Sequence, residues 1–487
     1  MKILAIDQGT TSTRALLYQH GRLTPVMQRA HRQILPAAGH VEHDSAELLA
    51  NLNAALQTDS ELVALANQGE SCLAWDARDG RPISPVIVWQ DDRTASDTAR
   101  LAGQGAGTEV MARAGLPLDP YFSASKLGWI MQNCPGAADL ARRGQLRMGT
   151  TDAFFRDRLT GRFQTDIATA SRTSLMNIET GAWDPLLCEL FGVPMSALPE
   201  ITPTAGDLGR LPNGARLAVS IVDQQAALFG HGCHDPGAAK ATFGTGAFVQ
   251  CVTDRLIRPD QAGPLPTVAW HLPGQPIRYG LDGAVYAAAA AIDWARSLGL
   301  FDDYAAISRF AAPPAIDRGL IFLPALAGLA CPHWDRRARG AWFGLALEHG
   351  AADMMQALLE GIALRTAEAI AAIDALQPLG SLSVDGGLTR NDYLLEFLAG
   401  LVPHPVNRAT EIESTALGLA HMALAADGHT VPQLPAPAPI AVPDNDRDKA
   451  AFRLARFGHI RAGLSRLAHE ADDLLPSSLH PDHDGRD

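Results

Sequence analysis

A short turn of glycine and hydroxyl residues lies between two strand-like runs near the start of the chain, and a similar unit recurs near its middle. The first unit covers residues 2–18 with the turn QGTTS at 8–12, and the second covers 240–252 with the turn GTG at 244–246. Such runs, interrupted by glycine, predict β-hairpins. A third strand-like run ends in paired glycines at 382–387. This recurrence predicts an α/β fold of two related copies that hold ligands between them.

The length of the chain also predicts two domains. It has 487 residues, whereas a single domain typically has about 150. A cluster of glycine and proline at 230–236 stands near the midpoint. We therefore expect an N-terminal domain over 1–230 and a C-terminal domain over 231–487. In the second, a proline-free stretch with apolar residues at helical spacing predicts a long buried helix over 353–376.

Composition excludes several classes of protein. Forty basic and fifty-three acidic residues leave a net charge of −13, which argues against nucleic-acid and membrane-surface partners because both need a basic face. None of the four lysines is followed by Ser or Thr, and a Walker A loop requires that pair, so a P-loop site is excluded. The six cysteines are widely spaced, and no apolar run is long enough for a bilayer. We expect a cytoplasmic protein.

The first turn offers a phosphate site that needs no lysine. Asp7 ends the strand-like run before it, and an acid at that position can hold Mg²⁺ directly or through water. Gly9 lets the backbone approach a phosphate, while the hydroxyl and N–H groups that follow can bond the phosphate oxygens. These residue types are also common in polar turns, so a plain hairpin turn is the alternative.

Asp223 is the second candidate for chemistry. It directly follows the strand-like run 216–222 and precedes a helical pattern over 224–229. Ligands bind at the carboxyl edge of an α/β sheet, and phosphoryl transfer needs one fixed carboxylate within reach of the attacking hydroxyl. Aspartate is also a frequent helix cap, so capping is the alternative interpretation.

Read in order, ten stretches of the chain resemble the FGGY family of carbohydrate kinases, within the actin-like ATPase superfamily, and among its members the glycerol kinases. These stretches extend from residue 3 to about residue 425. They are IDQGTTSTRA from Ile6, GHVEHD from Gly39, VWQDDRT from Val88, YFSASKLGWIMQN from Tyr121, TDIATASRTSLMNI from Thr165, DQQAALFGHGC from Asp223, KATFGTGAF from Lys240, LPALAGLACPHWDRRARGAWFGL from Leu323, VDGGLTRND from Val384 and STALGLA from Ser414.

The resemblance implies two actin-like, ribonuclease H-like α/β domains with ATP and Mg²⁺ in the cleft between them. It also implies an enzyme that transfers a phosphoryl group from ATP to an alcohol. Asp223 matches the catalytic base, and Asp7 and Asp223 match the acids near the metal. The residues that match ATP-binding positions are Thr10, Thr11, Arg14, Gly244, Thr245, Gly387 and Asn391. The residues that match the polyol pocket are Gln68, Glu70, Trp89, Tyr121, Asp223 and Gln224.

Two positions depart from the pattern of the glycerol kinases. Those enzymes carry Gln-Arg-Glu where this chain has Gly69 in the middle, and they carry glycine where this chain has Val222. The arginine contacts glycerol hydroxyls in that family. Because arginine presents a rigid fork of donors that glycine cannot replace, its loss predicts a pocket enlarged by the volume of a long side chain.

We therefore expect phosphorylation of a small polyol or sugar, with glycerol, converted to glycerol 3-phosphate, as the first expectation. A larger polyol or a ketopentose, similar to erythritol, ribitol or xylulose, is the alternative because of Gly69. A catalytically silent actin-like sensor is a second alternative, since a fold alone does not determine function. The resemblance also implies a homodimer or homotetramer.

Overall fold

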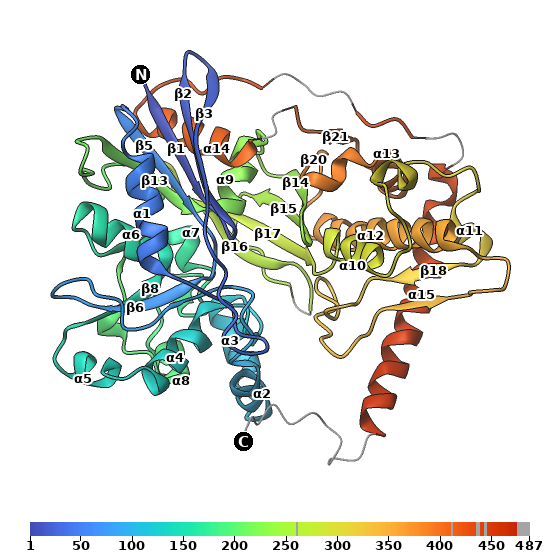
Figure 1. The fold of residues 1–487 in the computed structure, drawn as a ribbon, viewed down its shortest axis with the longest axis horizontal. Helices are drawn as coiled ribbons and strands as arrows, with labels where there is room; N and C mark the ends of the chain where they lie inside the picture. Colours follow the sequence, from blue (N-terminus) through green and yellow to red (C-terminus); the bar gives the residue numbers. More distant parts are fainter. Residues whose placement is uncertain (260–261, 411–412, 435–438, 443–445, 475–487) are drawn as a thin grey trace.

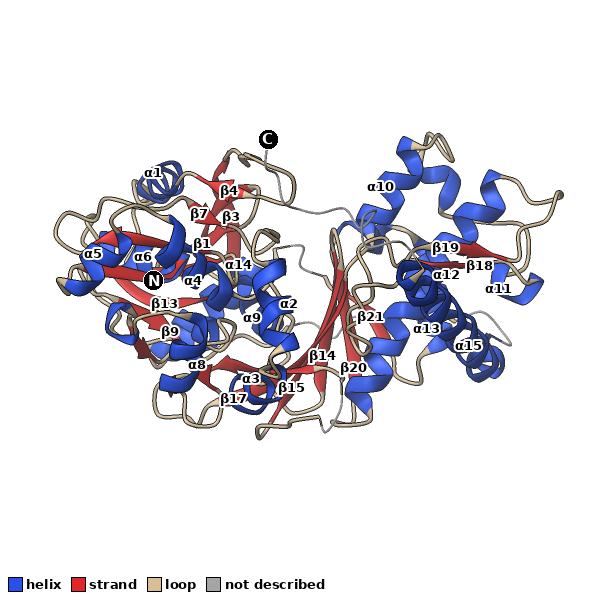
Figure 2. Cartoon of the chain, turned by 90° about the horizontal axis from the view of Figure 1, so that it is seen from below, coloured by secondary structure: helices blue, strands red, loops and turns tan. Residues whose placement is uncertain are grey.

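The computed structural model describes residues 1–259, 262–410, 413–434, 439–442 and 446–474. The chain forms two α/β bodies side by side, each arranged around a β-sheet (Figure 1). Figure 2 shows the elements of the N-terminal half on one side, the strands β14, β15 and β20 in the middle, and the helices α10 to α13 on the other side.

Five strands form the first sheet, in the order β13-β5-β1-β2-β3. Their bounds are β1 (Ile3–Gln8), β2 (Ser12–Gln19), β3 (Arg22–Ala30), β5 (Leu62–Asn67) and β13 (Arg216–Val222). Antiparallel pairing joins β1, β2 and β3, whereas β5 runs parallel to both β1 and β13. Every residue of β5 is buried, which explains its continuous apolar sequence, because a central parallel strand is covered on both faces.

The second sheet repeats this arrangement with one added edge strand, in the order β16-β17-β15-β14-β20-β21. Its strands are β14 (Ala238–Phe243), β15 (Ala247–Thr253), β16 (Leu265–Trp270), β17 (Arg278–Val285), β20 (Ser381–Asp385) and β21 (Val406–Arg408). Here β14, β15 and β17 are antiparallel neighbours, while β20 runs parallel to β14 and β21. The shared strand order confirms the predicted duplication, and both predicted hairpins are present.

Helices and short strands complete the two bodies. The N-terminal helices are α1 (Ser45–Ala55), α2 (Ala95–Gly103), α3 (Gly107–Ala114), α4 (Ser123–Asn133), α5 (Ala137–Arg142), α6 (Thr151–Thr160), α7 (Ile167–Ala170), α8 (Pro185–Phe191) and α9 (Asp223–Gly230). The later helices are α10 (Ala289–Ser297), α11 (Ala315–Arg318), α12 (Ala351–Asp374), α13 (Asp392–Leu401), α14 (Ser414–Ala426) and α15 (Asp446–Asp473). The short strands are β4 (Glu42–His43), β6 (Cys72–Asp76), β7 (Val86–Ile87), β8 (Leu146–Thr150), β9 (Gln164–Asp166), β10 (Met176–Asn177), β11 (Ala182–Trp183), β12 (Glu200–Thr202), β18 (Ile321–Leu323) and β19 (Ala341–Phe343).

Each large sheet has its own apolar core. The helix α12 packs in the core of the second sheet through residues such as Leu358 and Ile362, so the long buried helix expected there is confirmed. The helix α14 comes late in the sequence, yet Leu419 and Met422 pack in the core of the first sheet together with Ile221. The chain thus returns to its N-terminal body after building the second sheet. The domain boundary at residue 230 stays a prediction.

Two glycines bring α9 and α14 into backbone contact. A Cβ atom added to Gly418 would lie 1.8 Å from the carbonyl oxygen of Ala226, and one added to Gly230 would lie 1.9 Å from the carbonyl oxygen of Ser414. Because α9 begins at Asp223, this crossing supports the helix that carries the candidate base. No helix in the described part of the chain is both long and apolar enough to cross a membrane.

Candidate active site

The two hairpin turns have the tight geometry that a phosphate site needs. In the β1–β2 turn the N–H of Gly9 donates to the carbonyl of Ser12 at 3.1 Å, and in the β14–β15 turn the N–H of Gly244 donates to the carbonyl of Gly246 at 2.9 Å. A Cβ atom on Gly246 would lie 2.6 Å from the carbonyl oxygen of Val285, so only glycine fits there. Turns of this kind can present N–H and hydroxyl groups to an anion.

Asp223 lies where β13 ends and α9 begins. Its Oδ1 accepts a hydrogen bond from the N–H of Gln224 at 2.7 Å. Burial raises the pKa of the Asp223 carboxyl to about 7, and the negative charges of Asp7 and Glu70 add to the rise, whereas Lys240 opposes it. A carboxylate with a pKa near neutrality is suited to accept a proton, because it can both take up and release a proton at physiological pH.

Asp7 has the features of a metal-associated carboxylate. Its Oδ1 is buried and has no hydrogen-bond partner among the described residues. Burial raises the pKa of Asp7 to about 6, with Arg14 opposing the rise. Mg²⁺ is commonly held by one or two carboxylates together with substrate phosphates. Two half-buried carboxylates, Asp7 and Asp223, of which Asp7 has a buried oxygen without a partner, therefore fit a hard divalent cation.

A cavity of about 120 Å³ opens beside Asp223. Five of the six residues expected in the polyol pocket line it, namely Glu70, Trp89, Tyr121, Asp223 and Gln224. The ring of Trp89 packs edge-on against Tyr121, with centroids 5.6 Å apart, and its Nε1 donates to Thr10 Oγ1 at 3.0 Å. The β1–β2 turn and the pocket wall are therefore joined directly.

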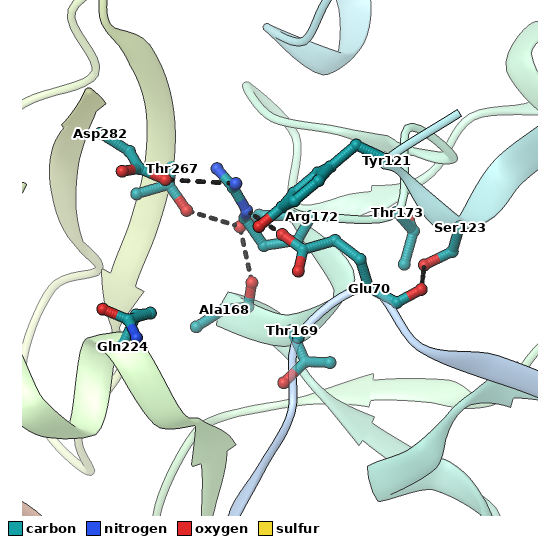
Figure 3. A network of polar contacts seen from close by, with 12 residues as sticks. Glu70, Tyr121, Ser123, Ala168, Thr169, Arg172, Thr173, Gln224, Thr267 and Asp282 are labelled. Atoms are coloured by element: carbon teal, nitrogen blue, oxygen red, sulfur yellow. Dashed lines mark hydrogen bonds and ion pairs between the residues drawn. The ribbon is translucent and has the colours of Figure 1, made fainter. Parts of the chain in front are cut away.

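Arg172 and Asp282 also line this pocket, and sequence reasoning missed both of them. Arg172 Nε donates to Glu70 Oε1 at 2.7 Å, and Arg172 Nη2 lies 3.2 Å from Asp282 Oδ2 (Figure 3). All three side chains are buried. Asp282 belongs to β17, so this network links the two bodies across the pocket. The signal that could have found Arg172 is its place as the one charged residue in a stretch of small and uncharged residues, since a buried guanidinium needs carboxylate partners. A lone acid inside a strand offered no comparable signal for Asp282.

The Glu70 backbone has φ +55°, in the left-handed region that residues other than glycine rarely adopt. Such conformations concentrate at functional sites, where surrounding contacts maintain them. Here the contacts are the Arg172 ion pair and a hydrogen bond of 2.8 Å that Ser123 Oγ donates to the Glu70 carbonyl (Figure 3). The strained backbone directs the Glu70 side chain toward the pocket that it lines.

Apart from Asp7, three predicted residues line neither the cavity beside Asp223 nor the larger cavity described below. Gln68 is buried behind the pocket, where its Nε2 lies 3.2 Å from His43 Nδ1. Arg14 forms an ion pair with Glu413. Thr11 is exposed at the first turn, and its carbonyl accepts a hydrogen bond from the N–H of His31 at 3.2 Å. Ligand contacts of these three residues stay predictions.

A second cavity of about 550 Å³ lies on the other side of the β14–β15 turn. Gly244, Thr245, Gly387 and Asn391 line it, together with the apolar Ile292. These are the four expected ATP-binding residues of the C-terminal half. The Nδ2 of Asn391 donates to the carbonyl of Ile307 at 2.9 Å, and its Oδ1 caps α13. The cavity has the size and the mixed polar and apolar lining typical of a small-molecule site.

Family models match most of the chain. The model of the N-terminal domain of the FGGY family of carbohydrate kinases matches residues 2–230, and that of its C-terminal domain matches 239–426. A glycerol kinase of Trichlorobacter lovleyi is 42% identical over 448 residues, which are 88% of this chain and 90% of the relative. A glycerol kinase of Rhodospirillum centenum is 41% identical over 442 residues, 86% of this chain and 88% of the relative.

Solved structures agree with the fold. The crystal structure of Plasmodium falciparum glycerol kinase with ADP superimposes with a TM-score of 0.85 at 26% identity, covering 94% of this chain and 98% of that chain. A gluconate kinase from Lactobacillus acidophilus superimposes with a TM-score of 0.86, covering 96% of this chain and 99% of that chain. At 21% identity, the second likeness concerns the fold alone.

Proposed function

The chain belongs to the FGGY family of carbohydrate kinases, and from this premise we propose that it transfers the γ-phosphoryl group of ATP to a primary hydroxyl of glycerol, producing glycerol 3-phosphate. The observation that carries the proposal is the polyol pocket, in which Asp223, Gln224 and Glu70 line one small cavity. Its volume of about 120 Å³ suits a three-carbon triol, because one water molecule takes up about 30 Å³ of liquid. The glycerol kinases that resemble this chain support the same substrate.

In the proposed mechanism Asp223 accepts the proton of the attacking hydroxyl. Glu70 and Gln224 orient the polyol, and the rings of Trp89 and Phe248, which also line the pocket, exclude water from it. The phosphoryl-transfer transition state is loose, so positioning and electrostatic stabilisation provide most of the rate acceleration. The direct test is ATP turnover by the purified protein with glycerol, with the product identified by NMR. No turnover with glycerol would overturn the proposal.

We propose that the 550 Å³ cavity binds the adenine nucleotide and that Asp7 and Asp223 hold Mg²⁺. The solved glycerol kinase with ADP supports a nucleotide in this fold, and the buried, unpartnered Oδ1 of Asp7 supports a cation. When bound, Mg²⁺ neutralises negative charge on the phosphate oxygens. Thr10, Thr245 and the N–H groups of their turns are the proposed phosphate contacts from the protein. A homodimer or homotetramer and a cytoplasmic location are part of the same proposal, supported by family resemblance.

The raised pKa of Asp223 makes the rate dependent on pH. Only the ionised carboxylate can accept a proton, and the pKa of the Asp223 carboxyl is about 7. The ionised fraction therefore falls as the pH drops below 7, and we expect kcat/KM for glycerol to fall by about tenfold per pH unit there. Initial rates between pH 5 and 8.5, with thermal melts at each pH to show that the protein stays folded, test this. A flat profile in that range would contradict a rate that is controlled by an Asp223 carboxyl with a raised pKa.

Gly69 and Val222, the two departures from the glycerol kinase pattern, meet in the structure. A Cβ atom on Gly69 would lie 2.9 Å from Val222 Cγ2, whereas carbon atoms in good contact are about 3.5–4.0 Å apart. Val222 thus occupies space into which a side chain at position 69 would grow. Val222 therefore restricts the space beside Gly69, and the enlargement of the pocket expected from the sequence stays a prediction.

This contact predicts coupled effects of substitution. We expect Gly69→Arg alone to lower kcat/KM for glycerol at least tenfold, because the new side chain collides with Val222. Adding Val222→Gly should recover most of the loss. Steady-state rates and melting temperatures of the two single variants and the double variant form the double-mutant cycle that tests this. If the two effects simply add, residues 69 and 222 do not compete for the same space.

A further inference from the structure

A side chamber adjoins the polyol pocket. It is a cavity of about 320 Å³, and it shares five lining residues with the pocket, namely Trp89, Tyr121, Arg172, Phe248 and Asp282. In Figure 3 Tyr121 and Arg172 stand together between Glu70 and Asp282. These side chains separate the two cavities, so a ligand held at Asp223 that reached the side chamber would extend around them.

Aromatic rings form part of the lining of the side chamber, alongside charged and small residues. Tyr286 and Trp334 line it in addition to the shared Trp89, Tyr121 and Phe248. The Tyr286 and Trp334 rings stand edge to face, with centroids 6.5 Å apart, and Trp334 Nε1 is held by a hydrogen bond of 2.7 Å to the carbonyl of Gly263. Rigid aromatic faces offer large contact areas for dispersion and apolar burial. The C–H faces of a sugar ring can pack against such rings.

An ion pair between the two bodies bridges the rim of the side chamber. Arg336 Nη2 donates to Asp119 Oδ1 at 2.8 Å and Arg336 Nε donates to Asp119 Oδ2 at 3.1 Å. The Arg336 guanidinium also lies over the Tyr286 ring, 4.3 Å from its centroid. Asp119 precedes α4, whereas Arg336 follows β18, so the pair joins the N-terminal body to the C-terminal one. This ion pair holds the two bodies together beside the side chamber.

The volumes of the two cavities indicate how large a substituent on glycerol the side chamber can hold. The polyol pocket has a volume of about 120 Å³ and the side chamber about 320 Å³, so the side chamber is the larger of the two. Glycerol accounts for the polyol pocket alone. An extension of one or two carbons would leave most of the side chamber unfilled, whereas a hexosyl ring of roughly eleven non-hydrogen atoms is comparable to it.

We infer that the side chamber is a binding subsite for a sugar-ring substituent on the acceptor, so that the enzyme phosphorylates a glycosylated glycerol at its free primary hydroxyl. This inference rests on the proposed function, because it places the glycerol portion in the polyol pocket beside Asp223. The sugar ring packs on Trp334 and Tyr286, and Arg336 and Asp119 stand at the rim within the same lining. Transfer itself is unchanged: the hydroxyl oxygen bonds to the γ-phosphorus, ADP leaves, and Asp223 takes the hydroxyl proton.

The test compares glycerol with 1-O-glucosylglycerol in wild-type enzyme and in Ala284→Phe. Ala284 lines the side chamber but not the polyol pocket, so the larger ring takes up part of the chamber. We expect wild-type kcat/KM for 1-O-glucosylglycerol to be at least one tenth of that for glycerol. In Ala284→Phe, the ratio of the two values should fall at least tenfold. The matched control is Ala305→Phe in the nucleotide cavity. It should raise KM for ATP and leave the ratio of kcat/KM for the two acceptors within about twofold of the wild-type ratio.

Failure of the inference and failure of the proposed function give different results. Suppose that the wild-type enzyme turns over glycerol but that its kcat/KM for 1-O-glucosylglycerol is below one hundredth of its kcat/KM for glycerol. That result overturns the side-chamber subsite and leaves glycerol phosphorylation intact. The subsite is also overturned if Ala284→Phe leaves the ratio of kcat/KM for 1-O-glucosylglycerol to kcat/KM for glycerol unchanged, because the chamber would then be only a passage for entry. Absence of turnover with either acceptor overturns the proposed function itself.

Discussion

Asp223→Asn is expected to lower kcat for phosphoryl transfer by about a thousandfold, the middle of the range for loss of a general base. The substituted amide keeps the size of the carboxylate and can still accept from the N–H of Gln224 through its oxygen, as Asp223 Oδ1 does at 2.7 Å. It cannot take up the hydroxyl proton. It also removes one of the two carboxylates proposed to hold Mg²⁺. The measurement is kcat at saturating ATP, Mg²⁺ and glycerol.

The control separates catalysis from folding and nucleotide binding. The 550 Å³ cavity does not include Asp223, so calorimetry with ADP without Mg²⁺ should give a dissociation constant within about threefold of the wild-type value. Asp302→Asn, at an exposed acid, is the matched substitution and should leave kcat unchanged. A variant at position 223 that retains more than a tenth of wild-type kcat would show that another group accepts the proton.

Gly418→Ala is expected to destabilise the protein by about 3 kcal/mol or more, at the upper end for overpacking a tight contact. The added Cβ would lie 1.8 Å from the carbonyl oxygen of Ala226, a backbone atom that cannot turn aside as a side chain does. The helices α9 and α14 must therefore separate. Since α9 carries Asp223 at its first residue, we expect lower activity in whatever fraction folds. Thermal melting and the soluble yield measure the loss.

The comparison for this variant is a glycine on an open helix surface. A Cβ atom on Gly463 in α15 meets nothing within 4 Å. Alanine there should raise the helix stability by up to about 1 kcal/mol, because glycine is the poorer helix former. The same chemical change should thus have opposite effects at the two positions. Equal melting temperatures for Gly418→Ala and wild type would contradict the backbone contact between α9 and α14.

Features that depend on local sequence could be predicted. The two hairpins follow from glycine-containing turns between apolar runs, and the helix α12 follows from the spacing of its apolar residues. Asp223 could be placed at a strand end because a strand-like run and a helical pattern adjoin it directly. In each case the information lies within about twenty residues, which is the range over which hydrophobic periodicity operates.

Features that depend on distant contacts could not be predicted. Arg172 meets Glu70 and Asp282 only because two separate bodies face each other across the pocket. Gly69 and Val222 were each recognised as unusual, but their contact became visible only in three dimensions. Gln68 matches a pocket position, yet its side chain is turned to His43 behind the wall. Sequence spacing constrains none of these arrangements.

The return of α14 to the first core affects how the protein can be divided. A fragment that ends at residue 230 would hold all five strands of the first sheet but would lack Leu419 and Met422, which pack in that sheet's core. Its apolar face would meet water, and such a surface favours aggregation. An N-terminal fragment that folds on its own would need α14 attached, for example by circular permutation. Spatial contacts, and not the order of the chain, therefore define the smallest fragment that can fold independently.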